Sequence, residues 1–347
     1  MPSLPSTEQM SDAIWPPAVI CAAMVLGSAI THELGGPSPL PLLGGYVAAA
    51  LGCTIFCMLV YVFLRIVALW RIGADKPLSI VAGELAPKIP LLTLPVLISP
   101  IFLAAFTAAK SAIPMLVGFR YDHLLANLDA AVFLTDPWRI THRFIGPVGT
   151  EVIQFFYVAI WVSALALSQA AIPIFASRKR VGIFFTAMLL TWFMAGFLIA
   201  YALPAAGPVF VNLSDPSLVS RFSPLTADLG RLLPPGSPFL HGPVYLEEGI
   251  KSGTAYSGGG ISAMPSMHIA VVTIYVLAAR RTFWFAPACL FALIIFIGSI
   301  HSGYHYAMDA AVAVPVAVLC WNATTILYRG PAPSWFREHR RLSGFLR

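Results

Sequence analysis

Long apolar stretches alternate with short polar segments along almost the whole chain of 347 residues. A helix needs about 20 mostly apolar residues to cross the hydrocarbon core of a bilayer. Only Arg280 and Arg281 separate the sixth and seventh stretches, which predicts a tight helical hairpin there. The pattern predicts an all-α, polytopic membrane helix bundle with about eight transmembrane helices, at 16–32, 41–69, 89–109, 148–176, 181–203, 264–280, 282–300 and 306–328.

Two longer polar stretches, 110–147 and 204–263, interrupt this pattern. Free backbone cannot cross lipid, so both stretches must lie outside the hydrocarbon region. Eight crossings put both on one side of the membrane and both chain ends on the other. Most lysines and arginines lie on the side of the chain ends, which the positive-inside rule assigns to the cytoplasm. We therefore expect a protein of the cell (inner) membrane with cytoplasmic termini and a site that faces the periplasm or exterior.

Composition narrows the class of protein. Hydrophobic residues make up 58% of the chain, charged residues 10%, and the mean hydropathy is +0.81. A soluble domain carries about 25% charged residues. These values therefore exclude a cytosolic enzyme, a disordered regulator and a nucleic-acid-binding protein. All five cysteines lie in apolar stretches and predict small core residues rather than a disulfide framework.

Two histidines that are distant in sequence fall at one predicted membrane face. His268 begins the sixth span and His305 begins the eighth, so one crossing and its return bring both to the side of the long polar stretches. His305 and Asp309 are four residues apart and share a helix face. The carboxylate can then accept the ring N–H and fix the tautomer, so that the other ring nitrogen attacks phosphorus. His268 is the candidate acid that protonates the leaving alkoxide.

A glycine-rich segment, Gly258-Gly259-Gly260, leads toward His268. Glycine permits close approach of a ligand to the backbone, and Pro265 at the start of a helix leaves backbone N–H groups free. With the hydroxyl of Ser266, this segment predicts an anion cradle for a phosphoryl group, with Gly260 and Ser266 among its residues.

These residues resemble signatures of the type 2 phosphatidic acid phosphatase superfamily. Pro265-Ser266-Met267-His268 is similar to the second signature, and Gly303 with His305-x-x-x-Asp309 is similar to the end of the third. The resemblance covers residues 110–328. It implies a six-helix acid-phosphatase-like core, lipid or isoprenoid phosphate esters as substrates, and a phosphohistidine intermediate formed without a metal or other cofactor. It makes His305 the nucleophile, Asp309 its partner and His268 the acid.

Further segments resemble the inositolphosphotransferase-like branch of this superfamily, which includes inositol-phosphorylceramide synthase. These segments are Phe119-Arg120-Tyr121-Asp122, Leu128-Asp129, Thr135-Asp136-Pro137-Trp138, Leu203-Pro204-Ala205-Ala206-Gly207-Pro208 and Met264-Pro265-Ser266-Met267-His268.

The chain departs from the family pattern at its phosphate-binding cations. The third signature normally opens with Ser-Arg, where this chain has Gly298-Ser299, and the Lys-x6-Arg-Pro signature does not follow from Lys110. Other cations must then balance the phosphate charge. Lys110, Arg120 and Lys251 are the candidates on that face, and juxtamembrane anchoring is the alternative role for each of them.

Three aspartates recur at seven-residue spacing, at Asp122, Asp129 and Asp136. This spacing places them close to one face of a helix at the interface. They either bind a hydroxylated acceptor head group or serve as helix caps and solvated acids.

The predicted function is cleavage or transfer of a lipid phosphate ester at the extracytoplasmic face. Water as the acceptor gives a phosphatase, and an alcohol gives a phosphotransferase, including transfer of inositol phosphate to a ceramide- or diacylglycerol-type lipid. One alternative is an intramembrane zinc hydrolase, because His301, His305 and Asp309 would form a ligand stripe on a continuous helix. Another is a non-enzymatic transporter with a histidine–aspartate proton relay.

The expected organisation has three parts: N-terminal transmembrane helices at 1–109, the catalytic membrane core at 110–328 and a basic cytoplasmic tail at 329–347. The expected partners are the membrane and a lipid phosphate or phospholipid substrate. The sequence does not define an oligomeric state.

Overall fold

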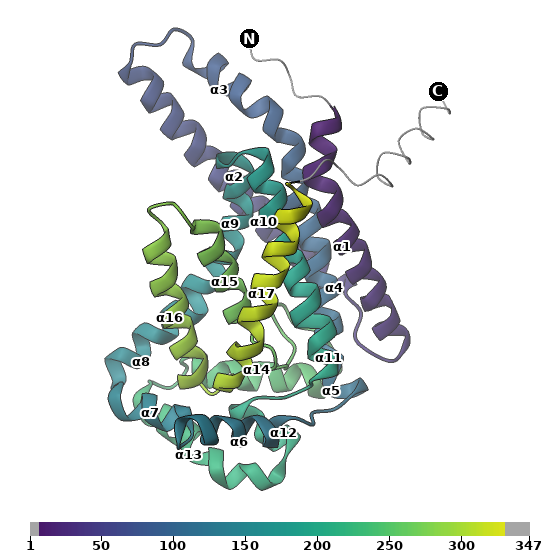
Figure 1. Ribbon diagram of the computed structural model, residues 1–347, viewed down its shortest axis with the longest axis vertical. Helices are drawn as coiled ribbons and strands as arrows, with labels where there is room; N and C mark the ends of the chain where they lie inside the picture. Colours follow the sequence, from purple (N-terminus) through teal and green to yellow (C-terminus); the bar gives the residue numbers. More distant parts are fainter. Residues whose placement is uncertain (1–6, 330–347) are drawn as a thin grey trace.

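The computed structural model describes residues 7–329, of which 81% are helical and none forms a strand. Figure 1 shows long helices standing together as a bundle, with a layer of short helices across one end. The start of α1 (Thr7–Glu33) and the end of α17 (Ala307–Leu327) lie away from this layer. The predicted all-α membrane class is confirmed. The predicted basic tail lies outside the described residues, apart from Arg329.

The two helices α15 (Met267–Ala279) and α16 (Phe285–His301) are apolar but have only 13 and 17 residues. At about 1.5 Å per residue, α15 covers roughly 20 Å, less than the ~30 Å hydrocarbon core. It is shorter than predicted because the chain before Met267 forms a loop rather than a helical turn. Without these two helices, six described segments are long and apolar enough to cross a membrane, whereas about eight were predicted. They are Asp12–Glu33, Leu40–Arg71, Pro77–Leu116, Pro147–Phe175, Arg178–Ala202 and Ala307–Leu327.

Three of these segments combine α-helix with 3₁₀- or π-helical turns. Such turns keep the backbone hydrogen-bonded, as lipid requires, while they change the helix direction. The predicted boundary at 109/110 falls inside one of them, within α4. The spanning pieces besides α1 and α17 are α2 (Leu40–Arg71); α3 (Pro77–Leu85), η1 (Ala86–Leu92), η2 (Leu94–Ile98), α4 (Ser99–Ser111) and α5 (Ile113–Leu116); α8 (Pro147–Gln154), η3 (Phe155–Ile160) and α9 (Trp161–Phe175); and α10 (Arg178–Thr191), η4 (Trp192–Ile199) and α11 (Ala200–Ala202).

The layer at the end of the bundle is formed by the two long polar stretches, which lie on the same side as predicted (Figure 1). Prolines start four of its helices, at Pro137, Pro208, Pro216 and Pro238, where a backbone N–H would have no helical partner. Gly253, with φ +65°, ends the helix that Pro238 starts. The layer comprises α6 (Asp122–Phe133), α7 (Pro137–Phe144), η5 (Pro208–Phe210), α12 (Val211–Ser214), η6 (Pro216–Leu218), α13 (Val219–Leu232) and α14 (Pro238–Ser252).

Helix α17 packs against α15 and α10, and α15 also packs against α16, which confirms the predicted hairpin. Ala313 and Ala317 are fully buried on α17, one turn apart. Small residues at this spacing let neighbouring membrane helices approach closely. This packing brings the first turns of α15 and α17 to the same end of the bundle, beside the layer.

Backbone hydrogen bonds connect the layer to these first turns. The N–H of Val209 donates to the carbonyl of Gly303 at 2.9 Å, and the N–H of Ala263 donates to the carbonyl of Ala205 at 2.7 Å. Gly207 lies between these bonds with φ +107°, and a Cβ on it would lie 2.5 Å from the carbonyl oxygen of Tyr304. Glycine is therefore required there for both conformation and space.

Replacement of Gly207 by alanine tests this contact. We expect Gly207→Ala to lower the thermal midpoint of the purified protein in detergent sharply, because the backbone strain alone costs on the order of 1–3 kcal/mol and the new methyl group collides with backbone. The control is Gly118→Ala, since Gly118 also has positive φ (+65°) but open space around its Cβ position. Equal midpoints for the two variants would contradict the close packing at Gly207.

Candidate active site

A cavity of about 1000 Å³ lies where the bundle meets the layer of short helices. Bound small molecules occupy pockets of roughly 300–1,000 Å³, so this one has room for a head group and part of a chain. His268 and His305 both line it, at the first turn of α15 and just before α17. The predicted meeting of these two histidines is therefore found, and their ring centroids are 5.8 Å apart.

The His305 ring is fixed at one nitrogen. Its Nδ1 lies 3.1 Å from Oδ2 of Asp309 and 2.8 Å from the carbonyl oxygen of Ala263. Both partners are acceptors at this point, so Nδ1 carries the proton. The other nitrogen, Nε2, has no hydrogen-bond partner in the described part of the chain. It is a free lone pair on a residue that lines the cavity.

The turn before α17 sets the position of His305. Helix α16 ends at His301, Gly303 takes φ +72°, and α17 begins at Ala307. Asp309, in the first turn of α17, also accepts the backbone N–H of Tyr306 at 2.9 Å. One carboxylate thus caps the helix and orients the histidine.

His268 lies between two aromatic rings. Its ring centroid is 4.2 Å from that of Tyr157, with 14° between the planes, and 4.2 Å from that of Trp161. Its ring nitrogens have no hydrogen-bond partner within residues 7–329. The aromatic neighbours hold the plane of the ring and leave its edge for a ligand in the cavity.

Asp129 and Asp122 anchor the start of α17 from the layer. Asp129 accepts the N–H groups of Ala307 and Met308 at 2.8 and 3.0 Å. Asp122 accepts the Tyr306 hydroxyl at 3.1 Å, and also the backbone N–H groups of Ala206 and Gly207. Since both carboxylates are buried and fully occupied, they cap helix and loop rather than bind an acceptor.

Asp136, the third aspartate of the series, is not on the same helix. Helix α6 ends at Phe133, and Asp136 immediately precedes α7. Its carboxylate pairs with Arg221 at 2.6 Å and with Arg139 at 3.4 Å. The predicted single acidic face is therefore wrong, because the turn at Leu134, with φ +62°, breaks the helical repeat.

A family model described as the PAP2 superfamily matches residues 123–323. The chain belongs to the PAP2 superfamily. The matched segment includes His268, His305 and Asp309. No curated protein and no solved structure gives a match. The superfamily is generally one of phosphoesterases, so this PAP2 protein is of the membrane phosphatase or phosphotransferase type.

Among the three predicted cations of this PAP2 protein, Lys110 lines the cavity, whereas Arg120 and Lys251 do not. Lys251 pairs with Glu247 at 3.8 Å and is exposed. Lys110 is reached by the glycine loop, because a Cβ on Gly260 would lie 3.0 Å from its Cγ. Gly260, which also lines the cavity, is thus required where the loop crosses α4.

Ser266, the serine predicted for the anion cradle, does not line the cavity, whereas Ser262 does. Ser266 is fully buried, does not line the cavity, and caps α15 by accepting the N–H of Ile269 at 3.4 Å. Ser262 does line the cavity, and its buried hydroxyl has no hydrogen-bond partner in the described chain. Sequence analysis did not select Ser262, because only the path of the loop distinguishes the two serines.

The zinc-ligand stripe is not formed, because His301 and Asp309 lie on different helices. The His301 ring is hydrogen-bonded at both nitrogens, to Thr150 at 2.9 Å and to Thr141 at 3.0 Å. Within residues 7–329, no three His, Cys, Asp or Glu side chains group as metal ligands would. His301 instead joins α16 to α7 and α8.

Three further contributors to the site carried no sequence signal that could be interpreted. Tyr157 and Trp161 flank His268 from a helix more than a hundred residues earlier, in an ordinary apolar stretch. Ala263 acts through its backbone carbonyl, so its side chain gives no indication of its role.

Asp129 gives a prediction for pH dependence. Burial raises the pKa of its carboxyl to about 6, although the N–H groups of α17 lower it. The folded protein then binds this proton more tightly than the unfolded chain, so stability from this group is lost as pH rises through 6. We expect the thermal midpoint of wild type, relative to Asp129→Asn, to increase as pH is lowered from 7 to 5.

The control is Asp215→Asn. Hydrogen bonds from Ser217 lower the pKa of the exposed Asp215 carboxyl, so its midpoint relative to wild type should not change over the same range. If the difference in thermal midpoint between wild type and Asp129→Asn stays constant over this pH range, the Asp129 carboxyl does not titrate there.

Proposed function

We propose that this PAP2 protein is an integral-membrane lipid phosphatase or phosphotransferase that acts through a phosphohistidine on His305. The observation that carries the proposal is the hydrogen bonding of Nδ1, which Asp309 and the carbonyl of Ala263 keep protonated. Nε2 is then the basic nitrogen and faces a cavity that already contains a second histidine. That combination supports nucleophilic attack followed by acid–base catalysis.

In the first step, Nε2 of His305 attacks phosphorus, and the bond from phosphorus to the lipid ester oxygen breaks. Asp309 stabilises the positive charge that develops on the imidazole. His268 begins the step protonated and gives its proton to the departing oxygen, which leaves as a neutral alcohol. The Lys110 ammonium and the Ser262 hydroxyl stabilise the charge on the phosphoryl oxygens.

In the second step, an acceptor oxygen attacks phosphorus, and the bond from phosphorus to His305 breaks. His268 is now neutral and takes the acceptor's proton, so both histidines return to their starting states. Water as the acceptor makes the protein a phosphatase, and an alcohol makes it a phosphotransferase. Inositol-phosphate transfer would use the same residues with a different donor and acceptor.

The walls of the cavity support a lipid substrate. Apolar side chains of the spanning helices also line it, among them Leu103, Val162, Leu165 and Trp192. Val162 is also 55% exposed on the surface of the bundle, so this wall lies at the surface that contacts lipid. An acyl chain bound along it remains in apolar surroundings while the phosphate reaches the histidines.

We assign the cavity to the extracytoplasmic face. It lies at the end formed by the two long polar stretches, and the short loops rich in arginine and lysine lie at the other (Figure 1). The cavity is also lined by four residues of the N-terminal part, which precedes position 110: Tyr46, Leu103, Phe106 and Thr107. The N-terminal helices therefore contribute to the substrate site as well as to the scaffold.

A change of leaving group tests the role of His268. We expect His268→Ala to slow hydrolysis of an alkyl phosphate lipid by about 100- to 10,000-fold, because the alkoxide then leaves without a proton. The loss should be far smaller for a nitrophenyl phosphate, whose leaving group is a stable anion. The measurement is the rate of product release by purified protein in detergent with each substrate.

Two further variants complete this test. His305→Ala should abolish turnover of both substrates, whereas His123→Ala should leave both unchanged, because His123 is exposed on α6 and does not line the cavity. Equal losses for the two substrates in His268→Ala, or turnover retained by His305→Ala, would contradict the proposed roles.

A further inference from the structure

Three tyrosines from the N-terminal helices and the layer line the cavity in addition to its two histidines. Tyr46 comes from α2, Tyr245 from α14 and Tyr256 from the loop after α14, and all three line the cavity. We call these residues the tyrosine cluster. None of them takes part in the proposed phosphoryl transfer.

Hydrogen bonds hold the hydroxyl ends of the tyrosine cluster. The Tyr46 hydroxyl accepts the N–H of Gly258 at 2.9 Å, and the Tyr245 hydroxyl donates to the carbonyl of Ser257 at 3.1 Å. The Tyr256 hydroxyl accepts from Ser252 at 3.3 Å. With the hydroxyls engaged in these hydrogen bonds, the clustered residues offer their ring faces as binding surfaces.

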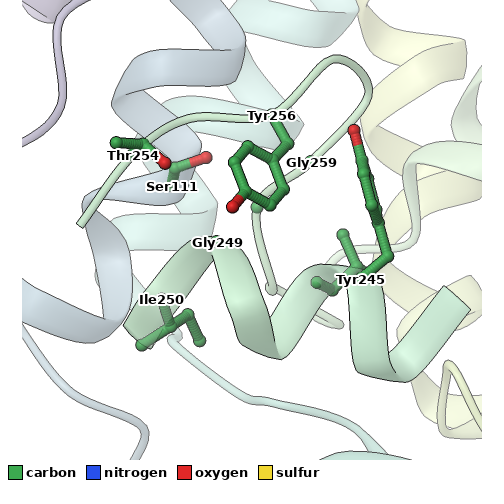
Figure 2. Close-up of a pocket in the computed structure, with 9 residues that line it drawn as sticks. Ser111, Tyr245, Gly249, Ile250, Thr254, Tyr256 and Gly259 are labelled. Carbon is green, nitrogen blue, oxygen red and sulfur yellow. The ribbon is translucent and has the colours of Figure 1, made fainter. Parts of the chain in front are cut away.

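The rings lie close enough together to act on one ligand. The ring centroids of Tyr245 and Tyr256 are 5.1 Å apart, with 39° between the planes. Figure 2 shows the Tyr256 ring over α14, between Ser111 and Tyr245. Burial raises the pKa of the Tyr245 hydroxyl, and the neighbouring hydroxyls of Tyr46 and Tyr256 raise it further, as expected for three phenols in one group.

An exposed carboxylate without a protein partner in the described chain accompanies the cluster. Glu248 lies three residues after Tyr245 on α14, lines the same cavity, and has no ion-pair or hydrogen-bond partner within residues 7–329. Its neighbour Glu247 differs in its position and in its pairing. Glu247 does not line this cavity and is paired with Lys251 and Asn212.

Apart from its histidines, the cavity therefore carries one charge of each sign. Glu248 is the single acidic residue and Lys110 the single lysine or arginine among its described lining residues. Lys110 belongs to the wall reached by Gly260, and Glu248 belongs to α14 beside the tyrosines. A ligand that matches this distribution has an anionic group and a cationic group on one polar head.

We propose that Glu248 and the tyrosine cluster bind the alkylammonium end of a zwitterionic phospholipid head group while its phosphate lies at the two histidines. The placement of the phosphate rests on the proposed function. Aromatic faces attract an alkylammonium ion through the ring quadrupole, and a carboxylate adds a direct ionic contact. A hydroxylated head group such as inositol has no positive charge to match Glu248.

The test compares lipids that differ only in head group. Short-chain phosphatidylcholine, phosphatidylinositol and phosphatidic acid with identical acyl chains are titrated by calorimetry into the full-length protein, purified in a maltoside detergent. His305→Ala serves as the background so that no lipid is consumed. We expect phosphatidylcholine to bind most tightly, and we expect Glu248→Gln and Tyr245→Leu each to weaken its binding about tenfold. Binding of phosphatidic acid should not change.

Glu247→Gln is the matched control, because it removes the same charge one residue away from the cavity and should leave phosphatidylcholine binding unchanged. Equal weakening of phosphatidylcholine and phosphatidic acid by Glu248→Gln would overturn the proposal, as would no weakening or a Glu248-dependent preference for phosphatidylinositol.

Turnover by the protein with native His305 separates this inference from the proposed function. Phosphate-ester turnover without any Glu248-dependent head-group preference would overturn the inference alone. Selective, Glu248-dependent binding of phosphatidylcholine with no turnover of any lipid would support the head-group site and contradict the proposed function.

Discussion

The candidate active site depends on one shared proton, the Nδ1–H of His305 between the Asp309 carboxylate and the Ala263 carbonyl. Asp309 belongs to the first turn of α17, and Ala263 belongs to the loop that leads into α15. The hydrogen bonds therefore join the two segments that carry the histidines. In an apolar interior, where water does not compete, such bonds are stronger than at the surface, and an unpaired group is costly. The same contacts that orient His305 thus also position the segment that carries His268.

The short helices of the layer make this junction rigid. Asp129 and Asp122 reach from α6 to the start of α17, and Ala205 binds the loop beside Ala263. These are bonds to backbone N–H groups and carbonyls and to the Tyr306 hydroxyl, so they fix position without selecting a ligand. The polar stretches outside the spanning helices therefore form one wall of the site. The histidines lie at the ends of the bundle helices.

Sequence alone predicted what depends on local periodicity. Apolar length predicted the long spanning helices, because it follows from helix geometry. The spacing of His305 and Asp309 correctly predicted that their side chains meet, but His305 lies in the turn before α17 and does not share a helix face with Asp309. Features that depend on tertiary contacts were missed or wrong. The sequence could not distinguish Lys110 from Arg120 and Lys251, because only the folded loop brings Gly260 into contact with Lys110. The zinc stripe assumed a continuous helix, which the turn at Gly303 interrupts. The separation of Ser262 from Ser266 likewise depends on the path of one loop.

The measurement that tests the phosphohistidine most directly is to trap it. Purified protein is incubated with a lipid that carries a labelled phosphate, quenched, and assayed for label that resists base and is lost in acid, as a phosphorus–nitrogen bond requires. A phosphohistidine on His305 predicts such label on the wild-type protein and none on His305→Ala. Measurable turnover by the wild type with no trapped label under rapid quench, or the same label on His305→Ala, would contradict it.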